Sequence, residues 1–429
     1  MTIKSYEFVK RPLKIDHRFE SKDDFGNYLS NQYDKGEFSG TNVVELNNIS
    51  FDFSVVIPFN FAGYPFNSNL SNLLMTGEYI INNCEFLSPV KLENSKREIN
   101  FDGQCWFNDS LRIQSRKTNL TFKNCEINDL DVSESIFGDE NSKLGKLRVK
   151  SCDVYKTKFK NATFHGLVDF YNTTFKENVI FYKTDFLNIV VLSATRFNQN
   201  ILFTYTLLND KVIMRSTIFD KGFDFSLAVL KGELTIFDLS HSYDKYYSEN
   251  GITKEFEYER AVSKSGVIPI QNKLETYRLL KLEFEKQKNI PEYLNFKLFE
   301  KKTYKQILAN KEWSFNNWFD KATLWLNGIS NNHGNSYFRA FLFIIIVGWF
   351  FFYLSFISTE NYEFTLNISL WEFNKGLSSF VQFLIPTHKF NYLGEEINLT
   401  PCYYVFDFLG RIFVGYGIYQ FIQAFRKFK

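Results

Sequence analysis

The sequence is poor in the residues that build metal centres and in the motifs that mark common catalytic sites. Its 429 residues include five cysteines, none of them in Cys-x-x-Cys spacing. No glycine-rich phosphate loop, Gly-x-Ser-x-Gly or His-Glu-x-x-His motif is present. We therefore expect no metal, no cofactor and no enzymatic activity. The histidines stand singly, and each is expected to be a surface or loop residue: His17, His165, His241, His333 and His388.

The chain also lacks a charge excess of either sign. Its formal net charge is only +2, which gives no reason to expect a polyelectrolyte partner for the chain as a whole. No apolar run precedes the charges in residues 1–14, so we expect no signal peptide. Hydrophobic residues make up 45% of the chain, enough to bury a large core in two or three domains.

From Phe159 to Leu239 the sequence repeats every 11 residues. Large apolar residues hold three positions of each repeat, as in Phe164, Val168 and Phe170. A small residue holds a fourth position: Ala162, Thr173, Thr184, Thr195, Thr206, Thr217 and Ala228. An α-helix cannot place these four series on one stripe, whereas a solenoid stacks equivalent positions one coil above the next. Two repeats, about 22 residues, would make one four-sided coil.

A degenerate form of the repeat continues upstream, as in Leu147-x-Val149-x-x-Cys152-x-Val154. We predict a β-solenoid over residues 42–240, with an insertion near 134–146, after a cap segment at 1–41. Four cysteines hold the small inward position and are expected to be stacked, buried thiols in a reducing compartment: Cys84, Cys105, Cys125 and Cys152.

The Thr/Ala/Cys-x-Phe units resemble the pentapeptide-repeat family over a little under half of the chain. The resemblance implies a right-handed, four-sided β-helix. This chain departs from the family pattern because intervals of five and six residues alternate, where the family repeats every five.

Two apolar stretches near the C-terminus are long enough to cross a bilayer, 340–357 and 403–425. Asp407 and Arg411 lie four residues apart in the second stretch and can pair on one helix face. They could line or brace a pore together with Tyr404, or form a structural ion pair that locks two helices. A seam of small residues would allow close helix packing in lipid: Gly410, Gly417 and Ala424.

Residues 337–429 form the predicted membrane domain, and the positions of its basic residues indicate its topology. Arg339 precedes the first span and a basic end follows the second, so both ends are expected on the cytoplasmic side. Residues 359–402 then form the external loop, with a helical stripe from Leu370 that ends at Pro386. This helix is too short to span, and could lie in the interface or dip into the membrane.

A helical connector is predicted at 241–336. Its first part, 241–265, is polar and is expected to be irregular. Helices follow from Gln271, from Pro291 with Asn289 as the cap, and over 315–326, where Gly328 can end the last one. Such a connector could transmit movement from the solenoid to the membrane, or could be a passive stalk.

The connector, the Asn331-Asn332-His333-Gly334 loop and the closing Tyr416-Gly417-Ile418-Tyr419-Gln420 stretch resemble bacterial pentapeptide-repeat proteins with a two-helix, ion-channel-like membrane part. They also resemble the membrane effectors of the Hailong anti-phage system. The resemblance implies a homo-oligomeric channel whose soluble part binds a single-stranded oligodeoxynucleotide, and growth arrest when the pore opens.

Basic residues cluster on predicted strands of the solenoid. They could bind the phosphates of a nucleotide or oligonucleotide, or could be a solvated strand face. The cluster comprises Arg112, Arg116, Lys117, Lys146, Arg148, Lys150, Lys156 and Lys158.

Two functions remain open from the sequence. The first is a channel of the bacterial inner membrane, gated by the solenoid. Because two spans cannot enclose a water path, it requires a homo-oligomer, and we favour a tetramer. The second is a membrane-anchored scaffold without transport, in which the charged pair of the second span has no evident use.

Overall fold

The computed structural model describes residues 12–38, 42–59, 64–95, 97–114, 117–141, 144–241, 249, 251–252, 254–360, 373–394 and 396–425. The chain divides into two compact units, Met1–Thr276 and Tyr277–Lys429.

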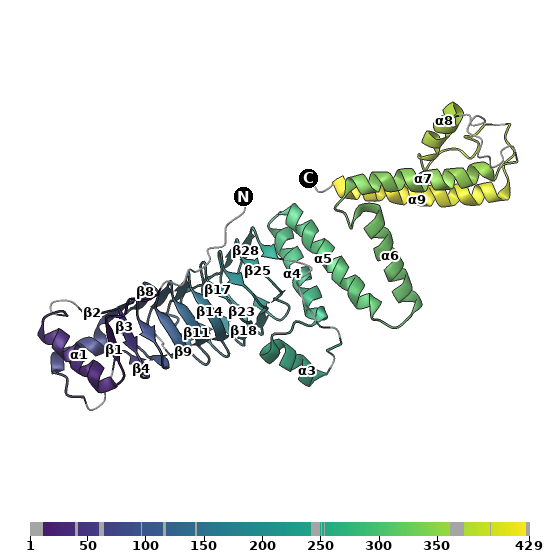
Figure 1. Cartoon of the computed structure of the whole chain (residues 1–429). Helices are drawn as coiled ribbons and strands as arrows, with labels where there is room; N and C mark the ends of the chain where they lie inside the picture. The colour runs from purple at the N-terminus through teal and green to yellow at the C-terminus, as the bar shows by residue number, and fades with distance from the viewer. Residues whose placement is uncertain are drawn as a thin grey trace. The chain divides into compact units, whose positions relative to one another are not determined.

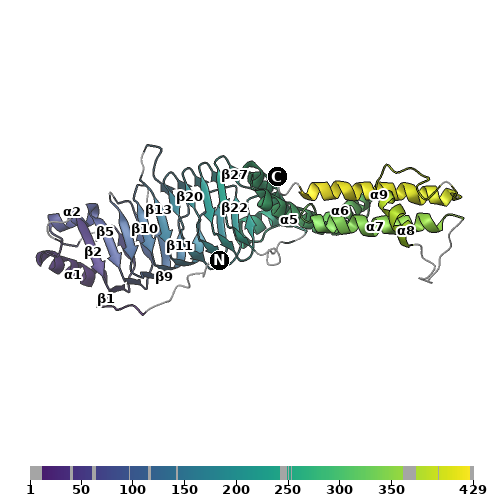
Figure 2. The same cartoon turned by 90° about the horizontal axis from the view of Figure 1, so that it is seen from above.

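The first unit is a solenoid of short parallel strands (Figure 1, Figure 2). The largest sheet contains β1 His17–Phe19, β3 Ile49–Phe51, β6 Glu85–Phe86, β9 Trp106–Ile113, β11 Glu126–Asp131, β14 Asp153–Lys158, β17 Thr174–Phe175, β21 Arg196–Phe197, β25 Ile218–Phe219 and β29 Ser240–His241, with β4 Val55–Ile57 and β7 Val90–Leu92 beside them. A second sheet contains β2 Val43–Asn47, β5 Glu78–Asn82, β8 Ile99–Asp102, β10 Leu120–Lys123, β13 Leu147–Lys150, β16 Val168–Asp169, β20 Val190–Val191, β24 Val212–Arg215 and β28 Leu234–Phe237.

Two smaller sheets complete the solenoid. One contains β12 Ile136–Phe137, β15 Thr163–Phe164, β19 Asp185–Phe186, β23 Leu207–Leu208 and β27 Val229–Leu230. The other contains β18 Val179–Tyr182, β22 Ile201–Thr204 and β26 Phe223–Asp224. The predicted β-solenoid is confirmed.

Strand register confirms that two repeats make one coil. Equivalent residues of every second repeat pair across the second sheet: Val168, Val190, Val212 and Leu234. Phenylalanines stack in the same way inside the coil. The rings of Phe175 and Phe197 lie 5.2 Å apart and only 4° from parallel. Each coil therefore buries its apolar series against the next coil.

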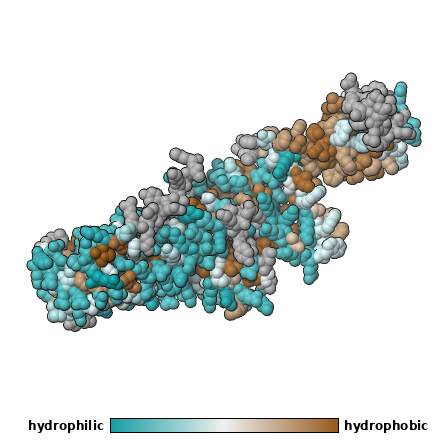
Figure 3. Space-filling model, in the orientation of Figure 1, coloured by the Kyte–Doolittle hydropathy of each residue, from teal (hydrophilic) through white to brown (hydrophobic). Residues whose placement is uncertain are grey.

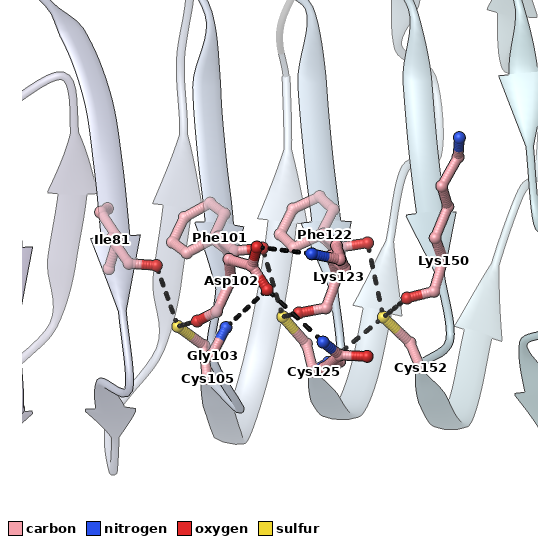
Figure 4. A network of polar contacts seen from close by, with 11 residues as sticks. Ile81, Phe101, Asp102, Gly103, Cys105, Phe122, Lys123, Cys125, Lys150 and Cys152 are labelled. Atoms are coloured by element: carbon pink, nitrogen blue, oxygen red, sulfur yellow. Dashed lines mark hydrogen bonds and ion pairs between the residues drawn. The ribbon is translucent and has the colours of Figure 1, made fainter.

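Where threonine or cysteine holds the small inward position, its side chain forms a hydrogen bond to the preceding coil. Thr195 Oγ1 donates to the Phe170 carbonyl at 2.7 Å, and Thr217 Oγ1 donates to the Leu192 carbonyl at 2.8 Å. Cysteines do the same upstream, where Cys105 Sγ lies 3.3 Å from the Ile81 carbonyl oxygen (Figure 4). Ala162 and Ala228 show that the position requires a small side chain, to which threonine and cysteine add a donor.

The four solenoid cysteines are buried and free, as predicted. Burial raises the pKa of the Cys84 and Cys125 thiols, so both stay protonated and can donate. Cys125 and Cys152 follow one another on consecutive coils, and the Cys125 amide donates to Cys152 Sγ at 3.3 Å. This arrangement fits a structural role for the thiols.

We predict that Thr195→Val destabilises the solenoid by ~0.5–1.5 kcal/mol, because the Phe170 carbonyl loses the hydroxyl donor and keeps only the Thr173 amide, while the side-chain volume hardly changes. Thr195→Ser keeps the hydroxyl and should cost less. Thermal or chemical unfolding of the two variants would measure the difference. Equal stability of the valine variant and the wild type would show that the hydroxyl contributes nothing.

Helices cover the N-terminal end of the solenoid. Helix α1, Lys22–Asp34, begins at Ser21, whose hydroxyl accepts from the Asp24 amide at 3.2 Å. Its Phe25 is fully buried and contacts the rings of Phe51 and Phe59. Helix α2, Ser68–Thr76, lies in the same end of the fold. These helices protect an edge that would otherwise be open to further strand pairing.

The other end of the solenoid carries helix α3, Glu255–Arg260, the π-helical turn η1, Ala261–Ser265, and the start of α4, Ile270–Lys286. The prediction of irregular structure over 241–265 is wrong for 255–265, since these residues form α3 and η1. Val262 of η1 is completely buried, which stabilises this helical segment. Thr204 Oγ1 on β22 donates to the Val262 carbonyl at 2.8 Å. On α4, Asn272 Nδ2 donates to the buried carboxylate of Asp224 at 2.9 Å.

The second unit is helical. After the rest of α4 it contains α5 Ile290–Ala309, α6 Phe315–Asn331, α7 Tyr337–Ile357, α8 Phe373–Phe383 and α9 Pro401–Phe425. Asn289 caps α5 as predicted, with its side-chain oxygen accepting from the Glu292 amide at 3.4 Å. Helix α6 continues past Gly328 and ends at Asn331, before Asn332 in the left-handed conformation.

Candidate functional site

Helices α7 and α9 are long and apolar enough to cross a membrane, and they match the two predicted spans. Only 28% of the most apolar window of each is buried within the chain, unlike the core helix of a soluble protein. The two helices lie side by side (Figure 1, Figure 2). Apolar surface gathers on this part of the chain, whereas the visible face of the solenoid is largely hydrophilic (Figure 3).

The predicted seam of small residues on α9 lies against α7 and α8. A side chain at Gly417 would meet Ile344 of α7, with its Cβ 2.7 Å from Ile344 Cγ1. At Gly410 the Cβ would lie 2.3 Å from the ring of Phe383 on α8. Ala424 is also buried. The seam therefore brings the helix backbones close together within one subunit.

Asp407 and Arg411 form the ion pair that their spacing predicts. Arg411 Nε donates to Asp407 Oδ2 at 2.7 Å. Asp407 is completely buried, and the Arg411 side chain is 19% exposed. The guanidinium carbon lies 4.1 Å from the centre of the Phe390 ring, at a distance typical of a cation–π contact. Tyr404, the third predicted pore residue, is 44% exposed.

His388 is a third member of this cluster, and the sequence analysis missed it. The residue lies in the segment between α8 and α9 and is buried. Its Nε2 lies 2.7 Å from Asp407 Oδ1, and its Nδ1 lies 2.7 Å from the Ile385 carbonyl oxygen. No spacing signal could have revealed it, since His388 and Asp407 are 19 residues apart and meet only after the chain folds back.

The hydrogen-bond partners of His388 determine which of its ring nitrogens carries a hydrogen. The Ile385 carbonyl can only accept, so His388 Nδ1 carries a hydrogen. The short contact between Nε2 and Asp407 also needs one proton, which can reside on either atom. The cluster thus brings an arginine, a carboxylate and an imidazole ring together beside two largely apolar helices, α7 and α9.

Aromatic rings surround the charged cluster. Tyr403 is completely buried, and its hydroxyl donates to the Phe390 carbonyl at 2.7 Å. Burial raises the pKa of Tyr392 well above its ordinary value, with the neighbouring Tyr403 and Asp407 adding to the effect. Phe383 packs against the His388 ring at 5.3 Å. These rings exclude water from the cluster, which strengthens its electrostatic interactions.

The basic residues predicted to bind phosphates lie on two different sheets. Strands β9 and β14 of the largest sheet carry Arg112, Lys156 and Lys158, and β13 of the second sheet carries Arg148 and Lys150, next to Lys146. Lys117 lies between β9 and β10, and Arg116 lies outside the described residues.

Several of these cations have acidic neighbours. Lys150 Nζ lies 2.9 Å from Asp169, Lys158 Nζ lies 2.7 Å from Asp129, and Lys117 Nζ lies 3.0 Å from Asp139. Strand β11 places Asp129 and Asp131 between β9 and β14. Part of the positive charge is therefore compensated, and phosphate binding by this cluster remains a prediction.

Among the described residues, no group of three or more His, Cys, Asp and Glu side chains could hold a metal ion.

Residues 150–196 match the family model described as pentapeptide repeats (9 copies). No curated protein and no solved structure matches the chain. The match lies within the solenoid and includes β14–β20. The chain therefore combines a pentapeptide-repeat β-solenoid with a helical unit that carries two candidate membrane-spanning helices.

Proposed function

We propose that this protein is a homo-oligomeric ion channel of the bacterial inner membrane, gated by its cytoplasmic solenoid. The observation that carries the proposal is the buried Asp407–Arg411–His388 cluster beside two candidate spans that are otherwise largely apolar. Ionisable groups inside a membrane are costly and usually mark an ion path or a moving part. Two spans per chain cannot enclose water, so the pore requires several copies, and we favour a tetramer.

The solenoid is the proposed sensor, a right-handed, four-sided coil with both chain ends in the cytoplasm. Its expected ligand is a nucleotide or single-stranded oligodeoxynucleotide bound at the basic residues of β9, β13 and β14. A ligand gates the pore only if it binds one state more tightly than the other. The polar contacts that hold α4 and η1 to the solenoid offer a route for such a change. Opening would depolarise the cell and arrest its growth, as an anti-phage effector does.

The alternative function is a membrane-anchored scaffold. Complete burial of Asp407 within one subunit favours it, because an ion pair that only holds helices together needs no contact with water.

Ion flux through protein reconstituted in liposomes tests the proposal. Flux should be measured without ligand and with short DNA oligomers or nucleotides, for the wild type and Arg411→Ala. Lys389→Ala is the matched control, since it removes an exposed cation next to the cluster. We expect Arg411→Ala to change the flux and Lys389→Ala to leave it unchanged. Absence of flux from folded, inserted wild-type protein under every condition would leave the scaffold as the better account.

A further inference from the structure

Helix α6 exposes an apolar face, which is unusual for a helix that contains this many polar residues. Its large exposed residues are separated by three, four or seven positions and so share one side of the helix. They are Phe315, Trp318, Phe319, Trp325 and Ile329, each about half exposed or more. A helix on the surface of a soluble domain shows the reverse arrangement, with its apolar side buried.

The polar side of α6 faces α9. Asn327 Oδ1 accepts from the Tyr416 hydroxyl at 2.7 Å and from Gln420 Nε2 at 3.0 Å. Asn331 is completely buried and donates to the Gln420 carbonyl at 3.1 Å. These contacts fix the rotation of α6, so the aromatic side must point away from α9.

The exposed aromatic side continues onto the ends of the two candidate spans. Only five residues separate α6 from α7, whose first residues Tyr337 and Phe338 are 46% and 61% exposed. The Tyr337 ring lies 5.3 Å from that of Phe425, at the end of α9. Tryptophan and tyrosine gather where a membrane protein crosses from lipid to water. The aromatic residues of α6 thus extend a belt that the spans already begin.

Helix α6 itself does not cross the bilayer. It has 17 residues, and Asp320 and Lys321 lie near its middle. Lys305 near the end of α5 and Lys311 just before α6 are exposed to anionic headgroups, and Glu312 lies next to Lys311. An apolar face rich in tryptophan, a polar face and nearby cations are the features of a helix that lies in the plane of the interface.

We propose that α6 lies along the cytoplasmic surface of the membrane, with Trp318, Trp325 and Ile329 inserted between the lipid headgroups. The partner of this face is a lipid surface. The inference rests on the proposed membrane crossing of α7 and α9, and it requires neither a pore nor a ligand. Helix α6 would then set the depth of the α7–α9 pair through its contacts with Tyr416 and Gln420.

Depth-dependent fluorescence quenching tests this proposal on the full chain in liposomes that contain anionic lipid. A single fluorophore is attached at Trp318→Cys or Trp325→Cys, and for comparison at Asn316→Cys or Thr323→Cys, which lie outside the apolar face. Cys402→Ser removes the exposed cysteine, and the other four are buried. Quenchers are a nitroxide near the lipid headgroup, a nitroxide deep in the acyl chain, and aqueous iodide.

We expect the headgroup nitroxide to quench positions 318 and 325 severalfold more than 316 and 323, and iodide to show the opposite order. A label at Ile346→Cys, exposed on α7, should respond to the deep nitroxide. If iodide quenches the label at position 346, the proposal that α7 crosses the membrane is wrong.

Three results would overturn the α6 proposal even when the label at position 346 is quenched by the deep nitroxide and not by iodide. Iodide could reach all four α6 positions, the deep nitroxide could quench 318 and 325 most strongly, or both kinds of quencher could fail at these positions. The last result would mean that protein, such as a second copy of the chain, covers the face. Two labels on each side keep the comparison possible if one variant fails to fold.

Discussion

Replacing Gly410 with leucine is expected to disrupt the packing of α7, α8 and α9, whereas leucine at Gly415 of the same helix is expected to be tolerated. A Cβ at Gly410 would lie 2.3 Å from Phe383 Cζ and 3.1 Å from Phe351 Cβ. Phe383 is completely buried, so either its ring or one of the helices must shift to make room. Overpacking a filled core costs ~1–3 kcal/mol or more, and leucine adds three further carbons beyond the Cβ.

Gly415 is the matched control because no atom lies within 4 Å of the Cβ position there. Leucine at this site also improves helix propensity by about 1 kcal/mol relative to glycine. The measurement is the loss of helical structure as SDS is added to the protein in mixed micelles. We expect Gly410→Leu to unfold at markedly lower SDS and Gly415→Leu to resemble the wild type. Equal tolerance of both variants would mean that α8 is not held against α9 at Gly410.

The repeat made the solenoid predictable because equivalent residues stack on one another. A period that survives over many coils is a global constraint, and Phe175 above Phe197 shows the stacking that it implies. The hydrogen bond that most small inward residues donate was less visible in the sequence. Threonine and cysteine share a small volume, and only the contact between Thr195 and Phe170 shows that the hydrogen bond is what both provide.

The corners of the coil could not be predicted from residue type. From Ala162 to Thr217, the residue before each small inward position has a positive φ, and asparagine fills several of these corners, as at Asn161 and Asn172. Others are Lys183, Ala194 and Tyr205, which have no intrinsic preference for this conformation. Stacking of the flanking strands imposes the corner there, so a local propensity argument fails.

The candidate site shows a similar division. The spacing of four residues on a helix was enough to predict that Asp407 pairs with Arg411. His388 joins them through a chain reversal between α8 and α9, which leaves no pattern in the sequence. The outward aromatic face of α6 also needed the structure. Its residues indicate an amphipathic helix, but only the contacts of Asn327 and Asn331 show which side faces the protein.

Removing Arg411 alone is expected to destabilise the membrane unit more than removing Arg411 and Asp407 together. Arg411→Met leaves a completely buried carboxylate that has lost its arginine partner and keeps its contact with His388 Nε2. Breaking a buried ion pair from one side typically costs about 3–5 kcal/mol, because the remaining charge is not compensated. Asp407→Leu should cost a similar amount by leaving the Arg411 guanidinium without its carboxylate in largely apolar surroundings.

The double variant Asp407→Leu/Arg411→Met removes both charges and fills the space with apolar atoms. Buried pairs replaced in this way are often close to neutral in stability. The SDS titration should therefore give a strongly non-additive double-mutant cycle. Additive losses would mean that the two side chains act separately and that the 2.7 Å contact between them contributes little.

Flux through the double variant then separates the two roles of the pair. If the charges only hold α9 against its neighbours, the double variant should regain both stability and flux, since the packing that opens and closes the pore is restored. If the charges take part in conduction or in gating, stability returns but wild-type flux does not. The single variants cannot make this distinction, because each loses stability and charge together. Restored folding without restored flux is the result that the channel proposal predicts.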